Sequence, residues 1–194
     1  MPRAGLGTAA VVAAGADLAD EIGFVCLSMG QLAERVGVRT PSLYKHVASQ
    51  DDLNRRIAAL ALNEAAAAIG AATQGRAGRD ALRAAAHGLR DFVLAHPGRY
   101  AATIGLEPAG PEDPIALAAA RLLEPFTAVL RGYDIAPAVM THALRALRSI
   151  FHGFATIEAS GGFQWSTGTD ESFEWLVDLV DIGLRAEPTR DVVR

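Results

Sequence analysis

One short stretch near the N-terminus, GVRTPSLYKHV at residues 37–47, carries the side chains best suited to contact a phosphate or a base edge. Its hydroxyl groups can donate and accept hydrogen bonds, and Lys45 supplies a positive charge. Leu43 and Val47 are four residues apart, so a helix that buries them turns the polar side chains outward. The pattern therefore predicts nucleic-acid contact. The alternative is the solvated face of a short helix in a protein that binds no DNA.

The elements that position this stretch are two short helices joined by a tight turn. Ser28 and Gln31 form a capping-box pattern that begins a helix, and Gly37 ends it. Thr40 is the expected cap of the next helix, with Pro41 at its first position. Two helices connected in this way predict a helix-turn-helix, whose second helix fits the major groove.

Helical signals continue to the end of the chain, and no strand pattern is recognisable. Further helices are predicted at 8–22, 50–69, 80–95, 114–131, 137–159 and 170–185, with a short one after Pro97. We therefore expect an all-α fold of about nine helices. Residues 24–27 are predicted to be short, apolar and buried, with Cys26 as a small core residue.

Composition limits the classes of function. The net charge is −4, but residues 1–60 hold six Lys/Arg and six Asp/Glu, so the deficit lies in residues 61–194. DNA contact would then depend on where charges are placed rather than on a large basic field. No apolar run reaches eighteen residues, and the N-terminal stretch lacks signal-peptide features, so we expect no membrane span and a cytoplasmic protein.

Other chemistry is weakly represented. The five histidines show no His-x-x-x-His or Glu-x-x-His pattern, and acidic pairs such as Glu112-Asp113 lie at helix starts, where capping explains them. No P-loop, dinucleotide fingerprint or nucleophile elbow is present. We predict no catalytic residue, no metal and no cofactor. A small all-helical enzyme and an interaction module without DNA remain the alternatives.

The stretch MGQLAERVGVRTPSLYKHVASQDDL, residues 29–53, resembles the N-terminal domain of the tetracycline-repressor (TetR) family of bacterial transcription regulators. The resemblance implies a helix-turn-helix DNA-binding domain at 1–49 and a helical ligand-binding and dimerisation domain at 50–194, joined by a connecting helix at 50–69. It also implies a set of DNA-contacting residues: Arg39, Thr40, Pro41, Ser42, Tyr44, Lys45 and His46. The implied function is a repressor that a small apolar or aromatic effector releases from a palindromic DNA operator.

Two departures from the family pattern concern charge. Many members carry a lysine at the start of the fourth helix, where this chain has Gln50, and the N-terminal arm offers only Arg3. Further along, RSIFHGFATIEASGGF (148–163) is similar to a C-terminal subtype with a Trp-His-Gly signature, replaced here by Phe151-His152-Gly153.

Aromatic residues of the C-terminal region are the candidates for an effector pocket, although each alone is more simply a core residue. The predicted lining is Phe92, Tyr100, Phe126, Phe151 and His152.

Two apolar stripes near the C-terminus are predicted to form a homodimer interface, as the family resemblance implies. Both recur at steps of three and four residues and need an apolar partner; the alternative is that they face the protomer's own core. The predicted interface is Leu147, Phe151, Phe154, Phe173, Leu176, Val177, Val180 and Leu184.

Overall fold

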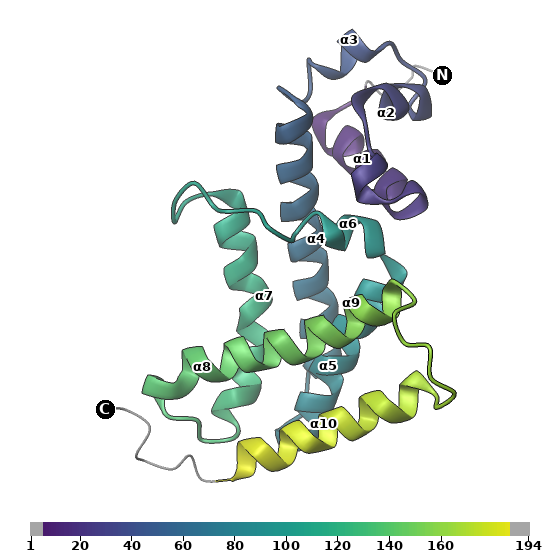
Figure 1. Cartoon of the computed structure of the whole chain (residues 1–194). Coiled ribbons are helices and arrows are strands. Elements are labelled where there is room, and N and C mark those ends of the chain that lie inside the picture. The colour runs from purple at the N-terminus through teal and green to yellow at the C-terminus, as the bar shows by residue number, and fades with distance from the viewer. Residues whose placement is uncertain (1–5, 187–194) are drawn as a thin grey trace. The chain divides into compact units, whose positions relative to one another are not determined.

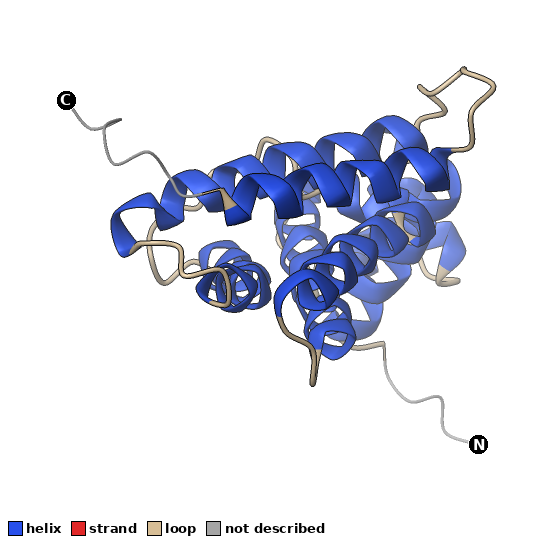
Figure 2. Cartoon of the chain, turned by 90° about the horizontal axis from the view of Figure 1, so that it is seen from below, coloured by secondary structure: helices blue, strands red, loops and turns tan. Residues whose placement is uncertain are grey.

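The computed structural model describes residues 6–186, and every regular element in that range is helical (Figure 2). The segment α8 Pro137–Leu147, a π-helical turn Arg148–His152 and α9 Gly153–Ala159 follow one another without a break. Counted as one helix, they bring the described range to nine α-helices, which confirms the all-α prediction. No helix in it is long and apolar enough to cross a membrane.

The first compact unit contains the described residues up to Glu64 together with Ala95–Arg121. Its elements are α1 Thr8–Ile22, a 3₁₀ turn Phe24–Cys26, α2 Met29–Arg35, α3 Thr40–Leu43, the first part of α4 Gln50–Thr73, α6 Pro97–Ala101 and the start of α7 Pro114–Arg131. In Figure 1 the purple and blue helices α1 and α2 lie beside each other, with α3 next to α2.

A single apolar core holds this unit together. Leu32, Leu43, Leu53 and Ile57 have no exposed surface, and Ala102, which follows α6, belongs to the same cluster. At Gly15 the helices α1 and α4 approach closely, since a Cβ there would lie 3.1 Å from Ile57 Cδ1. The core therefore combines residues from both of the chain segments that make up this unit.

The predicted burial of residues 24–27 is wrong for two of them. Val25 is 97% exposed and Cys26 is exposed, whereas Leu27 is buried. The cause is the short 3₁₀ turn between Gly23 and Leu27, because a single turn cannot direct consecutive side chains to one side.

The second compact unit contains Ala65–Leu94 and the described residues from Leu122 onward. It holds the end of α4, α5 Gly78–Ala95 up to Leu94, most of α7, the helix from α8 to α9, and α10 Thr169–Arg185. The helix from α8 to α9 and α10 lie side by side and run in opposite directions (Figures 1 and 2). Phe173 of α10 packs on this helix, with ring centroids 6.1 Å from Phe151 and 5.0 Å from Phe154.

Candidate nucleic-acid interface and effector region

The turn between α2 and α3 is built by its sequence. Ser28 Oγ accepts a hydrogen bond from the Gln31 backbone N–H and so caps α2. Gly37, at φ 70°, reverses the chain, and the Val38 N–H closes the turn on the Ala33 carbonyl at 2.9 Å. This geometry confirms the two predicted helices and their connection.

Helix α3 presents the predicted residues as expected from its buried side. Leu43 is fully buried and Val47 is 2% exposed. Arg39, Pro41, Tyr44 and Lys45 are exposed, while Thr40, Ser42 and His46 are partly buried. Thr40 is the first helical residue, and Arg39 holds the cap position without a side-chain hydrogen bond. The end of the stretch is anchored, because the His46 carbonyl accepts a hydrogen bond from Thr8 Oγ1 at 3.3 Å.

Helix α4 begins at a reciprocal cap. Ser49 Oγ accepts from the Asp52 N–H at 3.0 Å, and Asp52 Oδ2 accepts from the Ala48 N–H at 2.9 Å. The amide of Gln50 donates to Asn54 Oδ1 at 2.9 Å. At the position where many family members carry a lysine, this chain therefore has an uncharged amide, and its hydrogen bond stays within α4. Arg3, the other position discussed for charge, lies outside the described residues.

The cations near α3 divide into two groups. Arg35 pairs with Glu21, Arg56 with Asp52, and Arg55 with Asp113. Among the Lys and Arg residues described between positions 6 and 60, Arg39 and Lys45 alone have no carboxylate partner. Both are exposed, one at the start of α3 and the other just after its end. These two charges are available to a polyanion, whereas the other three are already neutralised.

Helix α6 is fastened to α1 within the same unit. A Cβ at Gly98 would lie 1.8 Å from the Ala19 carbonyl oxygen, so no larger residue fits without displacement. The buried Arg99 guanidinium pairs with Asp20 at 2.7 Å, with Glu64 at 2.8 Å and with Asp17. Helices α2 and α3 therefore share one packed unit with α6, which comes much later in the sequence.

The residues predicted to line an effector pocket are buried but are divided between the units. Phe92, Phe126 and Phe151 are at most 7% exposed and belong to the second unit, as does the partly buried His152, while Tyr100 is buried in the first. Phe151 and His152 occupy the π-helical turn, a feature often found at functional sites. Burial lowers the pKa of His152, and the nearby Arg148 charge lowers it further, which favours a neutral imidazole. A shared pocket for these five residues stays a prediction.

The predicted dimer stripes lie largely inside the protomer. Leu147, Phe151, Phe173, Val177 and Val180 are at most 8% exposed, and Phe154, Leu176 and Leu184 are partly buried. The exposed apolar side chains of the same helices are Ile157, Trp175, Leu179 and Ile182, at 44–66% exposure. These five residues pack in the protomer's own core, and the predicted dimer interface stays a prediction.

No cluster of three or more His, Cys, Asp or Glu suited to a metal ion occurs within residues 6–186.

The sequence matches a family model and two curated proteins. Residues 82–180 match the tetracyclin repressor-like C-terminal domain. The chain is 32% identical over 171 residues to the uncharacterized HTH-type transcriptional regulator Rv0681 of Mycobacterium tuberculosis, covering 88% of this chain and 78% of that one. It is 29% identical over 187 residues to the uncharacterized HTH-type transcriptional regulator YobS of Bacillus subtilis, covering 94% and 95%.

The fold also matches solved structures. One is BioQ, crystallised with its double-stranded DNA operator, at a TM-score of 0.70 and 24% identity over 94% of this chain and 99% of BioQ. At 24% identity this match shows the fold alone. The Trp-His-Gly subtype of the C-terminal region stays a prediction.

Proposed function

The chain belongs to the TetR family of DNA-binding transcriptional regulators and is not an enzyme. We propose that it is a cytoplasmic repressor that binds a palindromic DNA operator and is released from it by a small apolar or aromatic effector. In this proposal residues 1–49 form the DNA-binding domain, and residues 50–194 bind the effector and a second copy. The contacting residues are Arg39, Thr40, Pro41, Ser42, Tyr44, Lys45 and His46.

The observation that carries the proposal is the pair of unneutralised cations beside α3. Arg39 and Lys45 are exposed and have no carboxylate partner among residues 6–186, and the exposed Tyr44 precedes Lys45 in the sequence. Backbone phosphates supply most of the affinity of such proteins, and hydroxyl and basic side chains are their usual partners. BioQ, which has the same fold, was solved with its double-stranded DNA operator, and this supports DNA binding by the present chain.

A matched pair of substitutions tests this role. Fluorescence anisotropy would measure binding to duplexes from the DNA flanking the chain's own gene, for the parent, Lys45→Ala and Arg56→Ala. Lys45→Ala should weaken binding at low salt and reduce the slope of log affinity against log salt concentration by about 1, as expected for one lost phosphate contact. Arg56→Ala removes a cation already paired with Asp52 at 2.9 Å and should change neither quantity. Equal affinity and equal slope for Lys45→Ala and the parent would contradict the assignment.

Effector control follows from linkage. A small apolar or aromatic molecule bound among Phe92, Tyr100, Phe126, Phe151 and His152 releases DNA only to the extent that it prefers the DNA-free conformation. Helix α4 is the covalent connection, since its residues up to Glu64 belong to the first unit and the rest to the second. Calorimetric titration of an effector should therefore give a weaker affinity when operator is bound. The same affinity in both states would exclude this mechanism.

The homodimer in this proposal uses the exposed side of the last two helices. Ile150, Gly153 and Ile157 recur along the helix from α8 to α9, and Leu179, Ile182 and Gly183 along α10. A Cβ at Gly153 or Gly183 would meet nothing within 4 Å, so both positions leave room for close helix approach. Two reading helices are needed for the two half-sites of a palindrome.

A further inference from the structure

Lys45 differs from every other basic side chain of the protein in its chemistry. It is the only lysine among 18 Lys and Arg residues, so the remaining basic side chains are all arginines. A guanidinium stays protonated and does not react with mild acylating agents, whereas a lysine amine that has lost its proton is a nucleophile. Stable amide formation therefore has a single side-chain target in this chain, and that target lies beside α3.

The surroundings of Lys45 leave its amine accessible. The residue lies in the turn that follows α3, and its side chain is exposed. No carboxylate within residues 6–186 pairs with it, whereas Arg35, Arg55 and Arg56 all have acidic partners. The amine is therefore neither buried nor held in an ion pair, and a small reagent can reach its Nζ.

The charges beside α3 favour an anionic acyl donor. Arg39 is the other exposed cation next to this helix, and it also has no carboxylate partner in the described part of the chain. Two positive charges that are not neutralised raise the local concentration of a small anion, as they attract the phosphates of DNA. An acyl phosphate is such an anion, and it carries an activated acyl group.

We propose that Lys45 is an acylation site and that a small acyl phosphate is its donor. The unprotonated Nζ attacks the acyl carbonyl carbon, an N–C bond forms, and the C–O bond to the phosphate breaks. Inorganic phosphate leaves with the electron pair, and the proton lost from nitrogen passes to the phosphate or to water. Nothing is oxidised or reduced, and the product is an uncharged amide.

Acylation of Lys45 removes one of the two cations beside α3 that a DNA backbone can use. The acylated chain should therefore bind its operator more weakly. This effect on DNA rests on the proposed function, because it requires that Lys45 contacts a phosphate. The acylation step itself does not depend on that contact.

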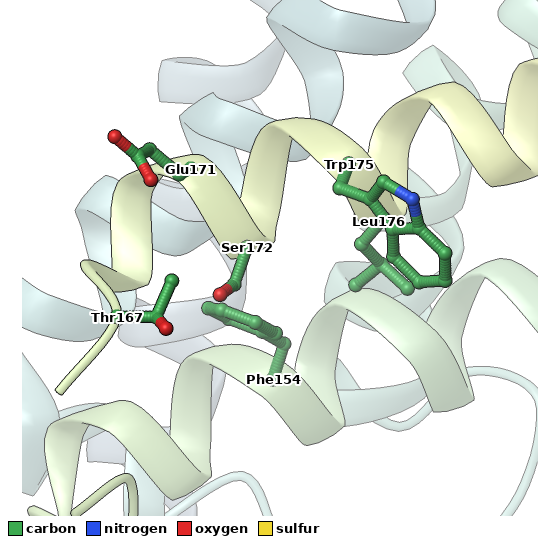
Figure 3. A pocket seen from close by; sticks show the side chains of 6 residues that line it. All are labelled: Phe154, Thr167, Glu171, Ser172, Trp175 and Leu176. Carbon is green, nitrogen blue, oxygen red and sulfur yellow. The ribbon is translucent and has the colours of Figure 1, made fainter. Parts of the chain in front are cut away.

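The exposed surface of the second unit contains no amine side chain that acylation could change. An open, largely apolar hollow between α9 and α10 is lined by Phe154, Thr167, Glu171, Ser172, Trp175 and Leu176 (Figure 3). It lies on the last two helices, which the proposed homodimer uses. Acylation should therefore change operator affinity without changing the oligomeric state, which gives the experiment an internal control.

Two donors that differ in charge test the acylation step. The full chain and the model amine Nα-acetyllysine amide would be treated together with acetyl phosphate or with the neutral thioester S-acetyl-N-acetylcysteamine, and mass spectrometry would follow both products. Acetyl phosphate should acylate Lys45 roughly threefold faster than the model amine at low salt, and the thioester should show no such advantage. The advantage should disappear in Arg39→Ala and at about 1 M salt, which screens the two cations.

Fluorescence anisotropy on the same samples tests the consequence for DNA. Complete acetylation of Lys45 should weaken operator binding roughly tenfold at about 0.1 M salt and reduce the salt slope by about 1. Lys45→Arg is the matched control, because it keeps a cation that acetyl phosphate does not modify while its N-terminal amine is acetylated as in the parent. Treatment should leave the affinity of this variant at its value before treatment, and light scattering should show the parental oligomeric state.

The results that overturn the proposal are separate from those that overturn the DNA contact. Acetylation of Lys45 by acetyl phosphate at no more than the rate of the model amine would reject the acylation site. Full acetylation with undiminished operator affinity, or an equal loss in treated Lys45→Arg, would reject the effect on DNA. Lys45→Ala reports on the DNA contact without any acylation, so a loss of affinity there keeps the proposed function even if the acylation site is rejected.

Discussion

Lys45 is the only lysine in the chain, which gives the proposed DNA contact a chemical signature of its own. Its side chain is exposed next to Tyr44, itself 52% exposed. An amine-specific reagent can modify this lysine and the N-terminal amine, and mass spectrometry separates the two peptides.

We expect operator DNA to slow modification of Lys45 severalfold, because a phosphate contact occupies and screens the amine. The N-terminal amine serves as the internal reference, and a duplex of unrelated sequence at high salt serves as the control. Modification of Lys45 at the same rate with and without operator would place the contact elsewhere.

Gly98 is the residue on which the packing of α6 against α1 depends. A Cβ there would lie 1.8 Å from the Ala19 carbonyl oxygen and 2.5 Å from the Asp20 nitrogen. Gly98→Ala should therefore lower the free energy of unfolding by about 3 kcal/mol, since backbone on both sides must move. Urea denaturation followed by circular dichroism measures the loss.

Gly70 provides the opposite control. It lies inside α4, and a Cβ there would meet nothing within 4 Å. Gly70→Ala should raise the free energy of unfolding by about 0.5–1 kcal/mol through helix propensity. A Gly98→Ala protein as stable as the parent would show that α6 does not need this close contact.

A row of ion pairs and one histidine–carboxylate hydrogen bond joins the antiparallel helices α5 and α10. Arg79 pairs with Asp178, Arg83 and His87 with Glu174, and Arg90 with Asp170. Most of these pairs are exposed and contribute little to the free energy of unfolding. Arg90 is different, because its side chain is 7% exposed and also pairs with Glu158 of α9, whose side chain is 12% exposed.

The buried pair of Arg90 and Glu158 predicts that the folded state loses stability in acid. Hydrogen bonds from Arg90 lower the pKa of Glu158 below the ordinary 4.5, and the Arg90 charge adds to the effect. A carboxyl with a lowered pKa stabilises the folded state above its unfolded pKa, and this contribution is lost as the pH falls through its folded pKa. The free energy of unfolding should thus decrease below about pH 4.5.

Glu158→Gln tests the source of that acid sensitivity. At pH 7 the variant should lose about 2 kcal/mol, the typical value of hydrogen bonds to a charged partner. Its stability should then fall less steeply than that of the parent between about pH 5 and pH 3. Parallel pH profiles for the two proteins would show that other carboxylates cause the acid response.

Helix positions were predictable here because local residues define them, whereas the buried side of α10 was not. The ranges 8–22, 114–131 and 137–159 agree with the structure, since glycine and proline signals mark their ends. Which side of α10 is buried depends on residues distant in sequence. Val180 and Leu179 are equally apolar, yet the first is 8% and the second 50% exposed. The π-helical turn at 148–152 also has no local sequence signal.

The exposed side of α10 is the surface through which two copies of the chain pack in the proposed homodimer. Half of the residues are apolar, and folded chains leave part of their apolar surface exposed to solvent. Phe173 and Val177 are fully buried, and the next positions around α10 carry Trp175, Leu179 and Ile182 at 50–66% exposure. Exposed apolar side chains in one row on a helix mark an interaction surface rather than a packing error. In the proposed homodimer a second copy of the chain uses the same row, as the two-fold symmetry of the proposed palindromic operator requires.

Substitutions at two adjacent positions of α10 distinguish loss of the proposed dimer from loss of the fold. Leu179→Glu places a charge on the exposed row and should give a folded monomer by light scattering, with a melting temperature near that of the parent protomer and much weaker operator binding. Val180→Glu buries the same charge one position later and should instead unfold the protein or cost at least about 3 kcal/mol. If Leu179→Glu remained a dimer at the concentrations at which the parent is one, the exposed row would not be the interface. A monomer that still bound operator with parental affinity would show instead that one reading helix is enough, contrary to the half-site argument.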